Sequence, residues 1–267
     1  MTQSTFAEFV SLHCAASPLI LPNVWDAAST VLFQAAGARA VATSSAALAW
    51  SLGYADGGAL PRTELLNAIH RIARVARVPL TVDIEDGYSD DPLEVAHLVV
   101  QIAQCGAIGI NIEDGVGTAD LLCSKIAAVR KVLAGQPLFI NARTDVYLRG
   151  LESGAAAVAL TMDRLTEYHR AGAEGAFVPG MTALDEVAQV VAYVSMPLNL
   201  MIVPGIATVP ELFSAGVKRI SVGPALFQAA YGLSVELVHG LVKRGDTSAL
   251  FARSLSYDMM NAEFSNP

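Results

Sequence analysis

Eight short apolar runs recur along the chain, and a longer amphipathic stretch follows each of them. The runs are rich in Val, Ile and Leu and cover residues 19–24, 40–43, 80–83, 108–112, 138–141, 175–178, 198–202 and 219–222. Buried parallel strands have this uninterrupted apolar character because helices cover them. Eight alternations with no linker between them predict an α/β fold, a (β/α)8 TIM-type barrel rather than a doubly wound sheet.

The stretches between the runs carry helix start and stop signals. Pro61 precedes one amphipathic stretch, and Asp91 followed by Pro92 opens another. Gly172 and Gly216 stand where a helix would end before the next strand. A length of 267 residues then fits a single barrel domain over 1–267.

Two further helical segments, 224–242 and 248–263, follow the eighth run. A plain barrel needs only one helix after its last strand. We therefore expect 248–263 to be a terminal oligomerisation helix that packs on a neighbouring subunit.

Composition excludes several classes of partner. The net charge is −8 and no cluster of Lys and Arg exists to follow a phosphate backbone, so we expect no nucleic-acid partner. Residues 187–210 are uncharged and long enough to cross a bilayer, but Pro197 and Pro204 fit a helix, a turn and a buried strand better. We expect no membrane association.

The cysteines and the first residues bear on location. Cys14, Cys105 and Cys123 are scattered and do not form a CxxC pair, which argues against disulfides and against structural zinc. The first eight residues lack the basic and apolar regions of a signal peptide. A cytoplasmic location is the expectation.

Acidic residues gather where the third and fourth runs end. Asp83 and Glu85 lie two residues apart, so strand alternation places them on the same side, and Glu113 ends the neighbouring run. Three carboxylates in one small volume repel one another unless a cation compensates their charge. Hard oxygen ligands suit Mg²⁺, with Mn²⁺ as an alternative.

Other residues at these strand ends have two readings. Arg143 can hold a substrate carboxylate or can simply pair with Asp145. We interpret Asp86, Asp114 and Asp145 as solvated surface residues or helix caps. After the second run, Ser44, Ser45 and Ala46 form a small-residue turn that could bind an oxyanion, and a glycine-rich loop beginning near Trp50 could fold over it.

The combination of motifs resembles the isocitrate lyase/phosphoenolpyruvate mutase superfamily over residues 21–232. The matching segments are Asn23-Val24-Trp25-Asp26-Ala27-Ala28-Ser29, Thr43-Ser44-Ser45 with Ser51-Leu52-Gly53-Tyr54-Ala55-Asp56, Val82-Asp83-Ile84-Glu85-Asp86-Gly87-Tyr88, Gly109-Ile110-Asn111-Ile112-Glu113-Asp114 and Ile140-Asn141-Ala142-Arg143-Thr144-Asp145. The resemblance implies a barrel enzyme that uses Mg²⁺ to hold a 2-oxo carboxylate or its enolate. It also implies a terminal helix exchanged between barrels in a homotetramer, a dimer of dimers.

The resemblance also implies roles for individual residues. The metal-site acids would be Asp83, Glu85 and Glu113. The candidate substrate-binding residues are Ser44, Ser45, Ala46, Trp50, Asn111 and Arg143, and the candidate catalytic residues are Arg143, Tyr54 and Asp56. Asp56 would be the loop acid that helps to hold metal-bound water, and Tyr54 is one of the alternatives, with water, for delivering a proton.

The chain departs from the family pattern after Glu113. Lyases of the family carry a Lys-Lys-Cys-Gly-His loop there, and mutases a loop with Lys, Asn and Ser, whereas this chain has only 115–120 before an apparent helix at Leu121. Cys123 lies inside that helix and does not match. Runs six and seven lead into Val178-Pro179-Gly180-Met181 and Asn199-Leu200-Met201, where relatives place polar pocket residues.

These departures favour a small substrate. Our first hypothesis is a Mg²⁺-dependent lyase that cleaves a C–C bond of a small 2-oxo or 2-hydroxy carboxylate, by retro-aldol cleavage or decarboxylation. Two alternatives stay open: C–P chemistry of the phosphoenolpyruvate mutase or phosphonopyruvate hydrolase kind, and a catalytically silent barrel that binds 2-oxo acids.

Overall fold

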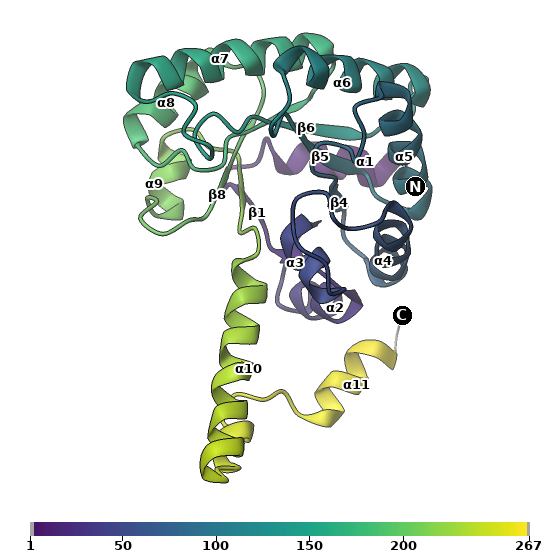
Figure 1. Ribbon diagram of the computed structural model, residues 1–267, viewed down its shortest axis with the longest axis vertical. Helices are drawn as coiled ribbons and strands as arrows, with labels where there is room; N and C mark the ends of the chain where they lie inside the picture. The colour runs from purple at the N-terminus through teal and green to yellow at the C-terminus, as the bar shows by residue number, and fades with distance from the viewer. Residues whose placement is uncertain (1–2, 266–267) are drawn as a thin grey trace.

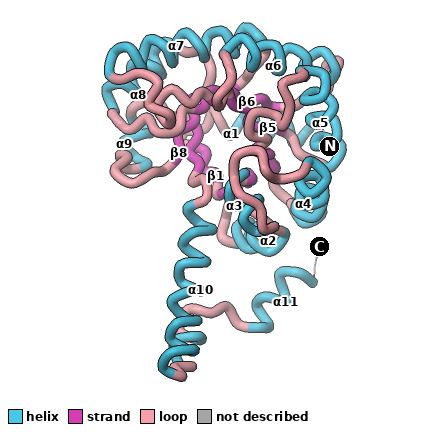
Figure 2. The backbone as a smooth tube through the Cα atoms, viewed as in Figure 1, coloured by secondary structure: helices cyan, strands magenta, loops and turns pink. Residues whose placement is uncertain are grey.

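The computed structural model describes residues 3–265 and places a closed parallel barrel inside a layer of helices (Figures 1 and 2). All the strand pairings are parallel, and the order is β1-β9-β8-β7-β6-β5-β4-β3-β2. The strands are β1 (Leu19–Leu21), β2 (Asn23–Val24), β3 (Val41–Thr43), β4 (Leu80–Asp83), β5 (Gly109–Glu113), β6 (Phe139–Arg143), β7 (Gly175–Phe177), β8 (Leu198–Met201) and β9 (Arg219–Ser221).

The first apolar run closes the barrel. Pro22 has no backbone N–H and divides this run into β1 and β2. Strand β1 pairs with β9, the last strand, while β2 pairs with β3. Eight runs therefore give nine strand segments, and the expected (β/α)8 barrel is confirmed.

Helices follow the strands as the sequence signals predict. They are α1 (Gln3–Leu12), α2 (Ala27–Ala35), α3 (Ser45–Ser51), α4 (Arg62–Val75), α5 (Pro92–Cys105), α6 (Ala119–Leu133), α7 (Gly154–Ala171), α8 (Leu184–Tyr193), α9 (Val209–Ser214), α10 (Ala225–Arg244), the 3-10 turn η1 (Ser248–Phe251) and α11 (Tyr257–Ser265). Asp91 caps α5 by accepting from the Leu93 N–H at 2.9 Å, and Gly172 ends α7 in a left-handed conformation. The uncharged segment 187–210 contains most of α8 and all of β8, as predicted.

Helix α1 packs against the end of the barrel where the strands begin. Its Phe9 and Leu12 are buried in a cluster with Ile108 and Phe139, which lie at the starts of β5 and β6. His13 follows α1, stacks on the Phe139 ring at a centroid distance of 4.7 Å and is 4% exposed. The opposite end, where the strands finish, is left for chemistry.

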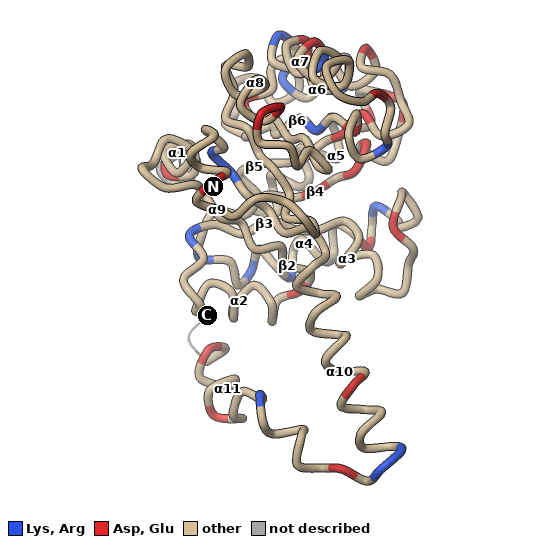
Figure 3. The backbone as a smooth tube through the Cα atoms, turned by 90° about the vertical axis from the view of Figure 1, so that its left-hand side faces the viewer, with Lys and Arg blue, Asp and Glu red and all other residues tan. Residues whose placement is uncertain are grey.

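Helix α10 projects away from the barrel, and the chain then turns back, so that α11 lies on the side of α2 (Figure 1). Only Phe227 and Gly240 of α10 are buried, while Tyr231, Val235 and Val242 are exposed. Figure 3 shows few charged residues along this helix. By length and composition alone α10 could cross a membrane. The expected terminal helix 248–263 is divided into η1 and α11, which packs against α2.

His13 gives the fold a pH dependence. Burial, and secondarily the Arg219 charge, lowers the pKa of His13 to about 4, and its Nε2 has no hydrogen-bond partner among the described residues. The unfolded chain binds a proton at His13 near pH 6.5, whereas the folded chain binds it only near pH 4, so the His13 contribution to stability falls as the pH drops from about 6.5 towards 4. The His13 contribution is about 3 kcal/mol over this interval.

Urea unfolding at several pH values measures this effect. The His13→Phe variant is expected to lose the His13 contribution, so that its stability relative to the native protein rises by about 3 kcal/mol between pH 6.5 and 4. Replacing the exposed His70 by Gln should leave the slope of the native protein unchanged. Equal slopes in the native protein and the His13→Phe variant would show that His13 is not the responsible group.

Candidate functional site

A cavity of about 230 Å³ opens at the ends of the strands. Eight of the eleven residues predicted from the sequence line it: Ser44, Ser45, Ala46, Trp50, Asp56, Asp83, Asn111 and Arg143. Seven other residues line it and were not among the predicted site residues: Asn23, Leu148, Phe177, Met201, Ser221, Gly223 and Pro224. Of the remaining predicted residues, Glu85 and Glu113 line a second cavity of about 240 Å³, and Tyr54 lines neither cavity.

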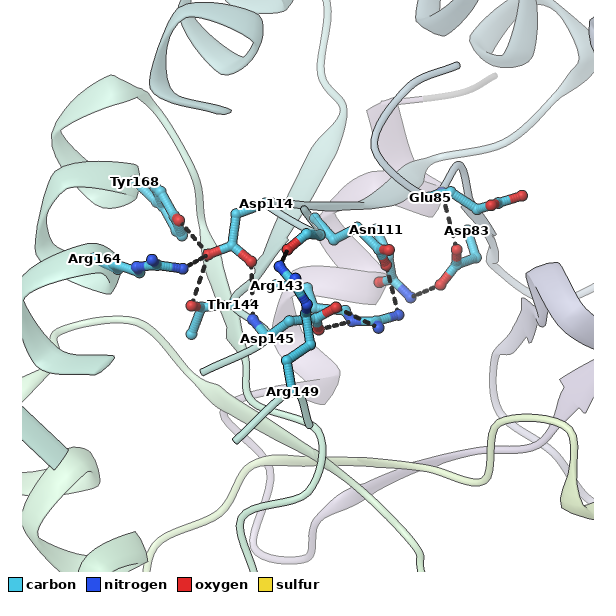
Figure 4. A network of polar contacts seen from close by, with 12 residues as sticks. Asp83, Glu85, Asn111, Asp114, Arg143, Thr144, Asp145, Arg149, Arg164 and Tyr168 are labelled. Atoms are coloured by element: carbon cyan, nitrogen blue, oxygen red, sulfur yellow. Dashed lines mark hydrogen bonds and ion pairs between the residues drawn. The ribbon is translucent and has the colours of Figure 1, made fainter. Parts of the chain in front are cut away.

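Asp83 is the buried carboxylate of the first cavity (Figure 4). Its Oδ2 accepts from Asn111 Nδ2 at 3.1 Å, and its Oδ1 accepts from the backbone N–H of Glu85 at 3.1 Å. Burial raises the pKa of Asp83 despite the opposing charge of Arg143, and Asp56 adds to the rise. Each carboxylate oxygen accepts one protein hydrogen bond, so each retains a lone pair for a ligand.

Glu85 does not follow the strand alternation that the sequence predicted. Strand β4 ends at Asp83, and Glu85 adopts a left-handed backbone conformation with φ 52°. Its carboxylate accepts from the Tyr88 hydroxyl at 2.7 Å and from the Gly58 N–H at 2.5 Å. The expectation that Asp83 and Glu85 project side by side from one strand is therefore wrong, because the strand has already ended.

Arg143 lies between two acids. Its Nη1 is 2.5 Å from Glu113 Oε2, and its Nε and Nη2 donate to the two carboxylate oxygens of Asp145 at 2.6 and 3.0 Å. Burial alone would lower the pKa of Arg143, but Glu113 and Asp145 outweigh it and keep the guanidinium charged. The pairing with Asp145, one of the two readings of the sequence, is confirmed.

Glu113 remains poorly compensated although Arg143 is close. Burial raises its pKa to about 8, and the neighbouring charges of Asp83, Asp145 and Glu85 add to the rise that Arg143 opposes. The negative charges of the acids that line the two cavities are thus only partly neutralised.

Asp114 is a buried anchor, which corrects the interpretation of this residue as a solvated group or cap. Its Oδ2 accepts from the Thr144 and Tyr168 hydroxyls and from Arg164 Nη1 at 2.7, 2.6 and 2.7 Å. Its Oδ1 accepts from the backbone N–H of Asp145 at 2.9 Å. Asp114 therefore fixes the residue that holds Arg143 (Figure 4).

The barrel interior below the cavity is polar. Asn111 Oδ1 accepts from Asn141 Nδ2 at 2.9 Å and from Arg219 Nη2 at 3.1 Å. Arg219 is 1% exposed, its Nε and Nη1 have no hydrogen-bond partner within residues 3–265, and burial lowers its pKa to about 9. These donors leave the Asn111 amide nitrogen directed at Asp83.

The start of α3 forms one wall. Ser44 caps this helix by accepting from the Ala47 N–H at 3.3 Å, and Ser45 and Ala46 begin it, where the preceding turn supplies no carbonyl acceptors. Asn23 supports the same region: its Oδ1 accepts from two backbone N–H groups after β9, and its Nδ2 donates to the Thr43 carbonyl. Tyr54 instead packs against the hydrophobic core.

The acids do not form a ready-made inner coordination sphere. Within residues 3–265 no group of three or more His, Cys, Asp or Glu side chains is close enough to hold a metal ion together. The expected crowding of Asp83, Glu85 and Glu113 into one ligand set is absent because Glu85 turns away and Glu113 pairs with Arg143. Their hard oxygens and raised pKa values still suit a divalent cation that waters help to coordinate.

Comparison with known proteins gives the family. The model of the phosphoenolpyruvate phosphomutase family matches residues 9–242. The chain belongs to this family. It is thus a member of the isocitrate lyase/phosphoenolpyruvate mutase superfamily, as the motifs indicated.

Individual family members resemble the chain over most of its length. An uncharacterized protein of Mycobacterium tuberculosis is 34% identical over 83% of each chain. The 2-methylisocitrate lyase of Aeropyrum pernix is 29% identical over 91% of this chain and 82% of the relative. The structure of a presumed lyase/mutase from Burkholderia cenocepacia has a TM-score of 0.90 and 32% identity, covering 99% of this chain and 96% of that one.

Family membership confirms the expectation of an enzyme of the isocitrate lyase/phosphoenolpyruvate mutase type. The segment after Glu113 is even shorter than predicted, because Thr118 caps α6 and this helix begins at Ala119 rather than at Leu121. Val116 in this segment is 85% exposed. Cys123 is half-buried in α6, and burial raises the pKa of its thiol, which fits the expectation of a packing residue.

Among the acidic residues at the ends of the strands, we expect Asp114 to contribute most to the free energy of unfolding. Asp114→Asn keeps the shape but removes the charge that faces Arg164, so we expect a loss of about 3 kcal/mol in the free energy of unfolding. Urea unfolding of Asp114→Asn, Arg164→Met and the double variant measures the coupling of the pair. Glu152→Gln, at an exposed position, is the control. A coupling energy below about 0.5 kcal/mol would contradict the anchoring role.

Proposed function

We propose that the chain is a divalent-metal-dependent lyase that cleaves a C–C bond of a small 2-oxo or 2-hydroxy carboxylate, by retro-aldol cleavage or decarboxylation. The observation that carries this proposal is the single cavity in which Asp83, Arg143 and the start of α3 face one another. Relatives named 2-methylisocitrate lyase and oxaloacetate decarboxylase, at 29% and 28% identity, support the reaction class.

Asp83, Glu85 and Glu113 would hold the cation, which we propose to be Mg²⁺ or Mn²⁺. Of these three acids, only Asp83 lines the first cavity, while Glu85 and Glu113 line the adjoining one, so we assign direct contact to Asp83 and contact through water to the other two. When bound, the ion supplies positive charge beside the substrate oxygens as an enolate develops.

The chain's own groups would orient the substrate carboxylate. Three of the five N–H donors of Arg143 are used by Glu113 and Asp145, which leaves two for a ligand. Ser44, Ser45 and Ala46 line the same cavity, and the N–H groups of Ser45 and Ala46 at the start of α3 would be available to an anion there. Asp56, on the loop between α3 and α4, lies at this cavity and would hold water near the ion.

The lining favours a simple cleavage over a step that needs a dedicated acid. Among the described lining residues there is no Tyr, His, Cys or Lys. Tyr54, the proton donor considered from the sequence, is half-buried against the hydrophobic core and does not line the cavity. Protonation of the enolate carbon therefore falls to water, which a retro-aldol cleavage or a decarboxylation tolerates.

Activity measurements test the proposal. We expect the protein with Mg²⁺ to release pyruvate from oxaloacetate or glyoxylate from a malate, and EDTA to abolish the release. Asp83→Asn should lower kcat/KM at least ~100-fold. It removes the charged ligand of the metal ion, and the ion would stabilise the negative charge that develops on the enolate. Asp163→Asn, at an exposed position on α7, is the matched control.

Two results would contradict the proposal in different ways. Full metal affinity in Asp83→Asn, measured by calorimetry with Mn²⁺, would remove the metal-site assignment. Thermal stabilisation by 2-oxo acids with no turnover of any of them would favour the silent binding barrel, and release of pyruvate from phosphonopyruvate alone would favour C–P chemistry.

We further propose that α10 and α11 pack on a second copy of the chain, in a homo-oligomer that we expect to be a tetramer. The exposed apolar face of α10 includes Tyr231, Val235, Val238 and Val242. Glu236 lies in the middle of this helix, and burying its charge at a bilayer centre would be costly, so a protein partner fits better. Light scattering on the purified chain tests this proposal: the mass of a tetramer would support it, and the mass of a single chain would contradict it.

A further inference from the structure

The cavity at the strand ends has a polar side and an apolar side, which come from different strands of the barrel. Strands β3 to β6 and the residues that follow them contribute its polar side, including Ser44, Asp83 and Arg143. The next strands in the barrel, β7 and β8, contribute Phe177 and Met201. Leu148, from the segment after β6, completes this apolar side.

The apolar side offers no second cation for a further negative charge. Arg143 is the only cationic residue among the described residues that line the cavity. Its guanidinium lies 5.7 Å from the centroid of the Phe177 ring, it pairs with Glu113 and Asp145, and its remaining donors are assigned above to the substrate's own carboxylate. Of the other nearby cations, Arg149 donates to the Gly115 carbonyl at the adjoining cavity, and Arg219 is enclosed beneath Asn111.

Part of the apolar side of the cavity is exposed and is not covered by neighbouring side chains. Leu148 is 48% exposed although it lines the cavity. A hydrocarbon group seated against Leu148 and the buried Phe177 would cover this surface, whereas a further carboxylate there would lose water without gaining a cation of its own.

From this arrangement we infer that the substrate carries a hydrocarbon substituent at C3, held against Phe177, Met201 and Leu148, rather than a carboxymethyl group. The inference rests on the lyase function proposed above and adds the class of substrate. For a 3-alkylmalate, the C2–C3 bond breaks, its electron pair remains on C3, and C3 takes a proton from water. The C2 hydroxyl loses its proton to water, and C2 becomes the aldehyde carbon of glyoxylate.

A shape-matched pair of ligands tests the inference. 3-Isobutylmalate and isocitrate differ only in whether C3 carries an isobutyl or a carboxymethyl group. With the full chain and Mg²⁺, we expect kcat/KM for glyoxylate release and affinity by calorimetry each to favour 3-isobutylmalate at least 10-fold. Along the series malate, 3-methylmalate and 3-ethylmalate, each added carbon should raise kcat/KM up to ~4-fold.

A charge placed in the apolar side should reverse the preference. Leu148→Arg lies at a half-open position that tolerates the larger side chain, and it should shift the ratio at least 10-fold towards isocitrate. Leu148→Met is the uncharged control and should retain the alkyl preference. Met201→Arg repeats the test from β8.

The outcomes separate the two proposals. Equal or better binding and turnover of isocitrate would overturn the alkyl inference and leave the lyase function standing. Tighter binding of 3-isobutylmalate without turnover of any compound would support the apolar subsite while removing the lyase function. An unchanged ratio in both arginine variants would show that the substituent does not contact Leu148 or Met201, which also overturns the inference.

Discussion

The pairing of Arg143 with Glu113 and Asp145 is the interaction on which the site depends. Four acids at the strand ends, namely Asp83, Glu85, Glu113 and Asp145, line two adjoining cavities. Without Arg143, mutual repulsion and burial would drive them apart or protonate them. One guanidinium, held from both sides, therefore permits a concentration of negative charge that is only partly compensated, and this is the property that a cation site requires.

Most of the barrel could be predicted because its signals are local. An apolar run, a proline after a helix-capping acid and a glycine before a strand each act within a few residues. The strand-end rule then located most of the cavity, because chemistry at a barrel's carboxyl ends follows from topology. Asp83 and Arg143 were found in this way, and both line the same cavity.

What could not be predicted depends on contacts that are distant in sequence or on where a strand stops. Asp114 resembles a solvated loop acid until Arg164 and Tyr168, 50 and 54 residues further on, are brought against it. Alternation predicted a shared side for Asp83 and Glu85, but alternation applies only inside a strand, and Glu85 lies beyond its end. Phe177 and Met201 belong to buried apolar runs, and no local signal distinguishes a cavity wall from core.

The polar interior of the barrel explains why Asp83 is so well placed. An amide group can be turned either way round unless its neighbours decide, and Asn111 Oδ1 accepts from both Asn141 and Arg219. Turning this amide would set its N–H groups against two donors and its oxygen against Asp83. The orientation of Asn111 is therefore fixed from below by a cation that never reaches the cavity, and the floor of the site always presents a donor to Asp83. Because Arg219 also lies over the Phe9 ring of α1 at 5.9 Å, the helix that closes the far end of the barrel is connected to the carboxylate at the near end.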